Sequence, residues 1–136
     1  MLKNLSHIGI AVQSITEAGK FYSENLRLGQ PKVMEVPDQK VKVAIFHCPG
    51  FEIELLEPIG PDSTIAKFLQ KRGEGIHHLC FNVDNIEAVL SEMKNAGVAL
   101  IDEKPRLGAT GNKIAFISPK STHGVLIELR EVKQSA

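Results

Sequence analysis

One short pattern occurs twice in the chain, and this repeat constrains the fold more than any other feature. The run HIGIAVQSI begins at His7, and the run HLCFNVDNI begins at His78. In both runs apolar residues occupy the second, fourth, sixth and ninth positions. A second match relates residues 53–55 to residues 127–129, both Ile-Glu-Leu, at an offset of 74 rather than 71 residues. A self-match at a nearly fixed offset indicates two copies of one structural module.

Each copy is expected to contain a strand, a helix and three further strands. Ser14 with Glu17 predicts a capping box at the start of the first helix, and Asp84 with Glu87 predicts one in the second copy. Alternating apolar residues predict strands at 7–12, 32–36, 41–47 and 51–57, and again at 78–83, 99–103, 113–118 and 124–130. A short helix capped by Asp62 or Ser63 is expected to join the copies. The fold class is therefore α+β, with two tandem βαβββ modules.

Composition limits the possible partners. The 136 residues include 16 Lys and Arg and 16 Asp and Glu, so no basic field is expected to attract nucleic acid or an anionic membrane. The N-terminus has no signal-peptide pattern, and no apolar run is long enough to span a bilayer. Cys48 and Cys80 have no CxxC spacing, which favours two buried thiols in a cytoplasmic protein.

Four residues at equivalent places in the two copies predict a metal site. Because side chains alternate along a strand, His78 shares its face with Cys80. An ionised carboxylate such as Glu128 in an apolar strand is costly unless another group compensates it. A single strand histidine is more often a hydrogen-bonded core residue, but His7, Glu54, His78 and Glu128 form a duplicated set. Two imidazoles and two carboxylates leave coordination positions open, which suits a catalytic divalent metal.

At these residues the chain resembles the vicinal oxygen chelate superfamily, the glyoxalase and bleomycin-resistance fold, and within it the methylmalonyl-CoA epimerase family. The resemblance covers nearly the whole chain and rests on HIGIAV, EPIGPDSTIAKFL, GIHHLCFNVDNI and PKSTHGVLIEL. It implies a single domain over 1–136 whose mixed sheet forms a cup around the metal. Module one would span about 1–58, the linker helix about 59–74 and module two about 75–131.

The resemblance also implies ligands, a cofactor and a reaction. The family's metal ligands fall on His7, His78 and Glu128, with Glu54 as the fourth, around a divalent ion such as Co, Mn, Ni or Zn. The implied reaction inverts the α-carbon of methylmalonyl-CoA through an enolate, and a homodimer is common in the family. Glu128 is the first candidate acid/base.

The second acid/base group stays open. Some relatives carry a Glu where this chain has Val43, so a metal-bound water, Glu54 or a loop residue could take that role. Candidate contacts for the phosphates of CoA are Lys113, Lys120 and Arg106.

Three other functions use related folds. Glyoxalase I, the lactoylglutathione lyase, uses the same type of metal cup, so the four ligands alone do not separate it from the epimerase. The segments GPDSTIAKFL and PKSTHGVLIEL favour the epimerase. A non-catalytic bleomycin-resistance type of binding protein commonly lacks the ligand set, and an extradiol dioxygenase would not need Glu54.

Overall fold

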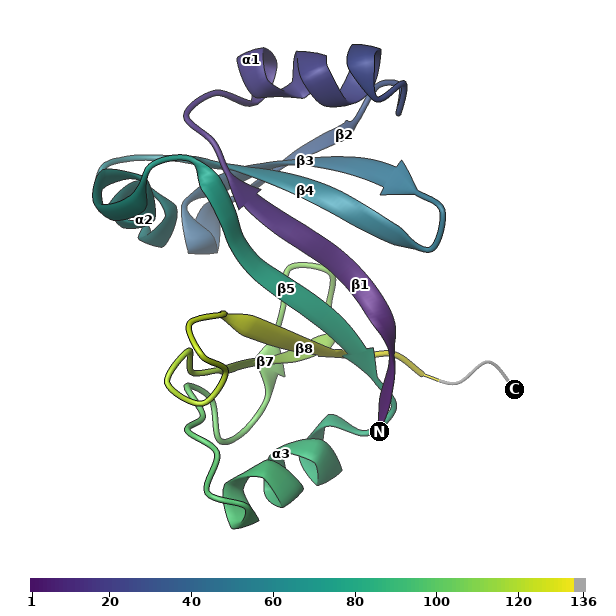
Figure 1. Cartoon of the computed structure of the whole chain (residues 1–136), viewed down its shortest axis with the longest axis vertical. Coiled ribbons are helices and arrows are strands. Elements are labelled where there is room, and N and C mark those ends of the chain that lie inside the picture. Colours follow the sequence, from purple (N-terminus) through teal and green to yellow (C-terminus); the bar gives the residue numbers. More distant parts are fainter. Residues whose placement is uncertain (134–136) are drawn as a thin grey trace. The chain divides into compact units, whose positions relative to one another are not determined.

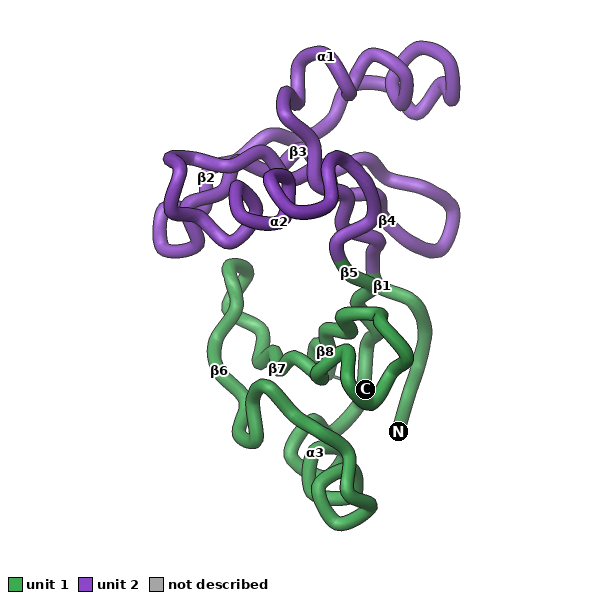
Figure 2. Tube along the Cα trace, turned by 60° about the vertical axis from the view of Figure 1, so that its left-hand side comes forward, with its two compact units in different colours: residues 1–6, 78–136 green, residues 7–77 purple. Residues whose placement is uncertain are grey.

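The computed structural model describes residues 1–133 and groups the chain into two units (Figure 2). One unit comprises His7–His77, and the other comprises residues 1–6 together with the chain from His78 onward. Among the described residues, no helix is both long and apolar enough to cross a membrane.

The unit His7–His77 holds the helix and strands predicted for the first copy (Figure 1). Its sheet has the order β2-β3-β4-β1, in which β1 and β4 run parallel and the other neighbours run antiparallel. Its elements are β1 (Leu2–Ala11, which begins in the other unit), α1 (Ile15–Lys20), the π-helical turn η1 (Phe21–Asn25), β2 (Lys32–Val36), the 3-10 turn η2 (Pro37–Gln39), β3 (Val41–Cys48), β4 (Phe51–Pro58) and α2 (Thr64–Arg72). Ser63 caps α2, because its Oγ accepts from the Ala66 N–H.

The unit that contains the chain from His78 onward repeats this arrangement. Its elements are β5 (Gly75–Val83, which begins in the unit His7–His77), α3 (Ile86–Asn95), β6 (Arg106–Leu107), β7 (Lys113–Ile117) and β8 (Ile127–Glu131). The strand order is β5-β8-β7-β6, with β5 and β8 parallel and the remaining pairs antiparallel. Each copy is therefore a βαβββ module with mixed strand directions, which confirms the predicted α+β class.

The repeat extends to the way each helix begins. Ser14 caps α1, as predicted, and its Oγ accepts from the Glu17 N–H. The Glu57 carboxylate of β4 accepts from the Ile15 N–H at 2.8 Å, and 74 residues later the Glu131 carboxylate of β8 accepts from the Ile86 N–H at 3.1 Å. A carboxylate from the last strand thus fixes the first turn of the helix in both copies.

The predicted capping box of the second helix is wrong. The N-cap is Asn85, whose Oδ1 accepts from the Ala88 N–H at 3.1 Å. Asp84 instead pairs with the N-terminal ammonium group, which holds the pKa of this carboxyl below its usual range. Glu87 binds Lys113 at 2.7 Å. Asp and Asn are both good caps, so the sequence could not place the helix start to within one residue.

Several predicted strand bounds differ from the structure: β1 begins at Leu2 rather than at 7, β5 begins at Gly75 rather than at 78, and two later strands of the second copy are also misplaced. No strand covers 99–103: Leu100 forms an isolated bridge to Ile117, and the edge strand β6 lies at Arg106–Leu107. Asp102 explains the difference, because its carboxylate accepts from the Phe116 N–H at 2.9 Å and occupies a donor that a regular ladder would use. The last strand begins at Ile127 rather than at 124, because Gly124 adopts φ +98° in a turn.

Among residues 1–133, three apolar clusters form the cores, and each cluster lies within one module. In the second module, one face of α3 packs on β7 and β8 through residues that include Ile86, Leu90, Ala115 and Leu129. In the first module, separate clusters lie under α1 and α2, and Phe46 and Leu55 belong to the α1 cluster. On β5 and β8, the face opposite the α3 cluster carries the polar residues described below. On β1 and β4, the equivalent polar residues share their face with Ala11 and Leu56 of the α2 cluster.

Glu131→Ala is expected to lower the free energy of unfolding by about 1–2 kcal/mol, because the Ile86 N–H loses a charged acceptor at the start of α3. Glu57→Ala should have a similar effect on α1. The measurement is urea unfolding followed by circular dichroism. Glu103→Ala is the control, because Glu103 pairs with Lys94 on the exposed surface and its loss should change the stability much less. Equal losses in all three variants would contradict the capping role.

Candidate functional site

The first half of the candidate site lies on the parallel strands β1 and β4. The strand register sets Gly9 opposite Glu54, and His7 precedes Gly9 by two residues on the same face. The His7 Nδ1 and Glu54 Oε2 atoms lie 3.3 Å apart. Only 9% of the His7 side chain and 17% of the Glu54 side chain are exposed. A buried imidazole therefore contacts a largely buried carboxylate.

The second half has the same construction on β5 and β8. The register sets Cys80 opposite Glu128, and His78 precedes Cys80 by two residues. The His78 Nε2 and Glu128 Oε1 atoms lie 3.2 Å apart, with side-chain exposures of 8% and 11%. Phe116 stands opposite Glu128 on β7, and its ring meets the His78 ring edge-to-face at 6.2 Å. This pair is therefore shielded from water.

Both halves combine an imidazole with a carboxylate at repeat-equivalent positions. Each carboxylate would be costly to bury alone, and the imidazole beside it compensates that cost. Imidazole nitrogen and carboxylate oxygen are also the donors that divalent first-row metals take. The sequence prediction named these four residues, and the structure pairs His7 with Glu54 and His78 with Glu128. The donor set fits a divalent metal.

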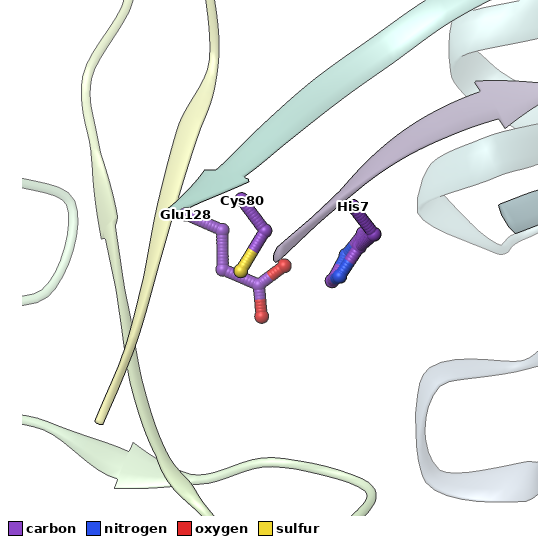
Figure 3. A group of neighbouring side chains, drawn as sticks. All are labelled: His7, Cys80 and Glu128. Atoms are coloured by element: carbon purple, nitrogen blue, oxygen red, sulfur yellow. The ribbon is translucent and has the colours of Figure 1, made fainter. Parts of the chain in front are cut away.

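Cys80 is a third potential donor in the second half, which the sequence prediction took for an ordinary buried thiol. Figure 3 shows its side chain next to that of Glu128, from adjacent strands. Its Sγ and a carboxylate oxygen of Glu128 lie within 4.8 Å of each other, and the residue has no solvent exposure. The equivalent position in the first half is Gly9. The alignment of the two sequence copies could have revealed the extra thiol, because it places Gly9 against Cys80 when His7 is placed against His78.

The three cationic candidates for phosphate binding occupy different places. Arg106 and Lys113 lie on the paired strands β6 and β7, whereas Lys120 follows the other end of β7. Arg106 contacts Asp102 at 3.5 Å, and its guanidinium lies 5.4 Å from the Phe116 ring centre. The Glu87 carboxylate raises the pKa of Lys113, which keeps this ammonium group charged.

Val43, at the position where some relatives carry Glu, belongs to the apolar core. It is 7% exposed, and its register neighbours are Met34 and Leu56. It packs in the cluster beneath α2. Val43 therefore offers no ionisable group at this position.

Most of the chain matches a known family. The Glyoxalase/Bleomycin resistance protein/Dioxygenase superfamily matches residues 6–116. The chain belongs to this superfamily, whose enzymes typically bind a divalent metal.

Its similarity to individual proteins extends over nearly its full length. A Bacillus subtilis protein named YqjC is 46% identical over 97% of this chain and 94% of its own length. The human mitochondrial methylmalonyl-CoA epimerase is 37% identical over 96% of this chain and 74% of its own. A methylmalonyl-CoA epimerase solved with methylmalonyl-CoA and NH4+ superimposes with a TM-score of 0.88 at 32% identity, covering 96% of this chain and 95% of that protein.

Proposed function

We propose that this chain is a methylmalonyl-CoA epimerase that interconverts the two epimers of its substrate by removing and returning the α-proton. The proposal rests on near full-length similarity to epimerases together with the duplicated, buried His–Glu pairs. None of the relatives described above favours glyoxalase I.

His7, Glu54, His78 and Glu128 are proposed to hold one divalent ion, with Co, Mn, Ni and Zn as candidates and Co as the first to test. Two nitrogen and two oxygen donors leave positions for substrate on a six-coordinate ion. When bound, the ion supplies Lewis-acid stabilisation of the negative charge that develops on the thioester carbonyl. A closed structural zinc shell would more often use cysteine ligands throughout.

The acid/base work falls to carboxylates of this chain. Inversion requires proton removal on one face of the α-carbon and proton delivery on the other, so two groups are needed. Glu128 is proposed as one of them, since it lies in a shielded position against His78 and Phe116. Glu54 is proposed as the second, because it occupies the equivalent place in the other module and Val43 has no ionisable group. Burial of both carboxylates limits competing proton exchange with water.

The metal proposal predicts binding of one Co2+ or Mn2+ per chain in isothermal titration calorimetry. His7→Ala and His78→Ala should each weaken this binding by at least about 100-fold, since even indirect contacts to a metal are worth 10- to 100-fold. His47→Ala is the matched control, because His47 is exposed on the β3–β4 hairpin beside Glu52. Unchanged affinity in both ligand variants would contradict the site.

The acid/base proposal predicts which exchange reactions survive when one carboxylate is replaced. The wild-type protein should incorporate solvent deuterium at the α-carbon from both epimers of methylmalonyl-CoA. Glu128→Gln and Glu54→Gln each keep an oxygen ligand but lose one base. Each variant should therefore retain exchange from one epimer only and lose epimerisation by at least about 100-fold. Glu103→Gln is the control, and NMR is the measurement.

The outcomes of this experiment separate the rival functions. Loss of exchange from the same epimer in both variants would contradict the two-carboxylate mechanism. Conversion of the glutathione–methylglyoxal hemithioacetal, without α-exchange in methylmalonyl-CoA, would identify glyoxalase I instead.

Arg106, Lys113 and Lys120 are proposed to contact the phosphates of the acyl-CoA substrate. Arg106→Gln and Lys113→Gln, from one strand pair, should each raise KM several-fold with little change in kcat, because they bind substrate remote from the reacting carbon. If these residues contact the 3′-phosphate, each substitution should raise KM less for the dephospho-CoA analogue of the substrate than for the substrate itself. Lys120→Gln tests the third position, and Lys67→Gln on α2 is the control. Equal KM in wild type and all variants would contradict the assignment.

We further propose that the two modules form a single domain, and that the protein acts as a cytoplasmic homodimer. The family resemblance and the balanced charge support this proposal. Several apolar side chains are exposed and available for an interface, including Leu107 at 74% and Ile76 at 60%. Light scattering during size-exclusion chromatography would measure the oligomer.

A further inference from the structure

The second module contains a potential metal ligand that the first module lacks. The two His–Glu pairs are equivalent in sequence offset, strand register and burial. They differ at the residue facing the carboxylate, where Gly9 has no side chain and Cys80 has a thiol. A third donor is thus built into one half of a duplicated site.

Cys80 is a fully buried residue whose neighbours on its own strand face and across the strand pair are polar. Cys80 has no solvent exposure, yet among the described residues it belongs to none of the three apolar clusters. Its neighbours on the same face of β5 are His78 and Asn82, and Asn82 accepts from the Arg130 Nε–H at 3.1 Å. Its cross-strand neighbour is Glu128. The thiol therefore faces polar groups, two of which are themselves proposed to take part in metal binding or proton transfer.

The distance allows both groups to reach one ion. Two ligand atoms on one Zn2+ lie about 3–4 Å apart, given metal–donor distances of about 2.0–2.3 Å. The Cys80 Sγ and a Glu128 oxygen lie within 4.8 Å, so an approach of roughly 1 Å suffices. The Glu128 side chain can make this movement by rotation about its own bonds.

We propose that Cys80 is an additional ligand that joins His78 and Glu128 around thiophilic ions, so that the site prefers Co2+, Zn2+ and Cd2+ over Mn2+. This inference rests on the proposed metal site and specifies its ion preference. The thiol proton passes to the solvent buffer as the metal–sulfur bond forms. Sulfur is a soft donor that favours these ions, whereas oxygen ligands suit Mn2+. Without the sulfur, the remaining nitrogen and oxygen donors still suit a six-coordinate ion.

Cobalt spectroscopy tests the proposal directly, in a Cys48→Ser background that leaves Cys80 as the one thiol. Co2+ added to this protein should produce a sulfur-to-cobalt charge-transfer band in the near ultraviolet. Cys80→Ser should abolish the band and lower Cd2+ affinity by about 10- to 100-fold, with less than about a twofold change for Mn2+. If serine destabilises the buried position, Cys80→Ala replaces Cys80→Ser in the test. Thermal unfolding of both variants without metal shows which one is folded.

Cys48 provides the matched comparison. It lies at the end of β3, and burial together with the Glu52 carboxylate raises the pKa of its thiol. The single variant Cys48→Ser should bind Co2+ like the wild type and keep the band.

The possible results separate this inference from the proposed function. Stoichiometric Co2+ binding without a charge-transfer band would overturn the role of Cys80 and leave the four-ligand site intact. An unchanged Cd2+ affinity in Cys80→Ser would do the same. A band that disappears with Cys48 rather than Cys80 would also overturn it. Failure to bind any of these ions, measured by calorimetry, would overturn the metal site itself.

Discussion

The fold places an ionisable carboxylate inside each module, and its pairing with an imidazole makes this possible. Glu54 and Glu128 lie on the last strand of their modules, and each contacts the histidine of a parallel neighbour at 3.2–3.3 Å. An unpaired charge there would oppose folding. Much of the local architecture serves this pairing, since the parallel strand pairs set the register and the helices cover the opposite, apolar faces.

The same strands connect the site to the stability of the helices. Three residues after each site carboxylate, a second glutamate accepts a hydrogen bond from the first turn of its helix: Glu57 for α1 and Glu131 for α3. A shift of β4 or β8 would therefore disturb both the histidine pair and the helix cap. This shared dependence gives the site a rigid support, which a mechanism based on precise proton transfer requires.

The duplication leaves room for the two halves to differ. The first half has a glycine opposite its carboxylate, whereas the second has Cys80 opposite Glu128, with Asn82 on the same face of β5 bound to Arg130. Under the proposed function, the paired carboxylates would share the proton transfer and the residues that differ between the halves would set the ion preference.

The sequence alone determined the features that depend on periodicity and repetition. The offsets of 71 and 74 residues predicted two βαβββ modules and four candidate site residues, which the structure joins in two His–Glu pairs, because equivalent positions in a duplicated fold have equivalent neighbours. Only the tertiary structure decided features that depend on contacts between distant segments. The Asp102–Phe116 hydrogen bond replaced a predicted strand, Asn85 rather than Asp84 capped α3, and Cys80 faced Glu128. Local patterns carry no information on which distant donor or acceptor a side chain will meet, because that choice is made by strand pairing and packing.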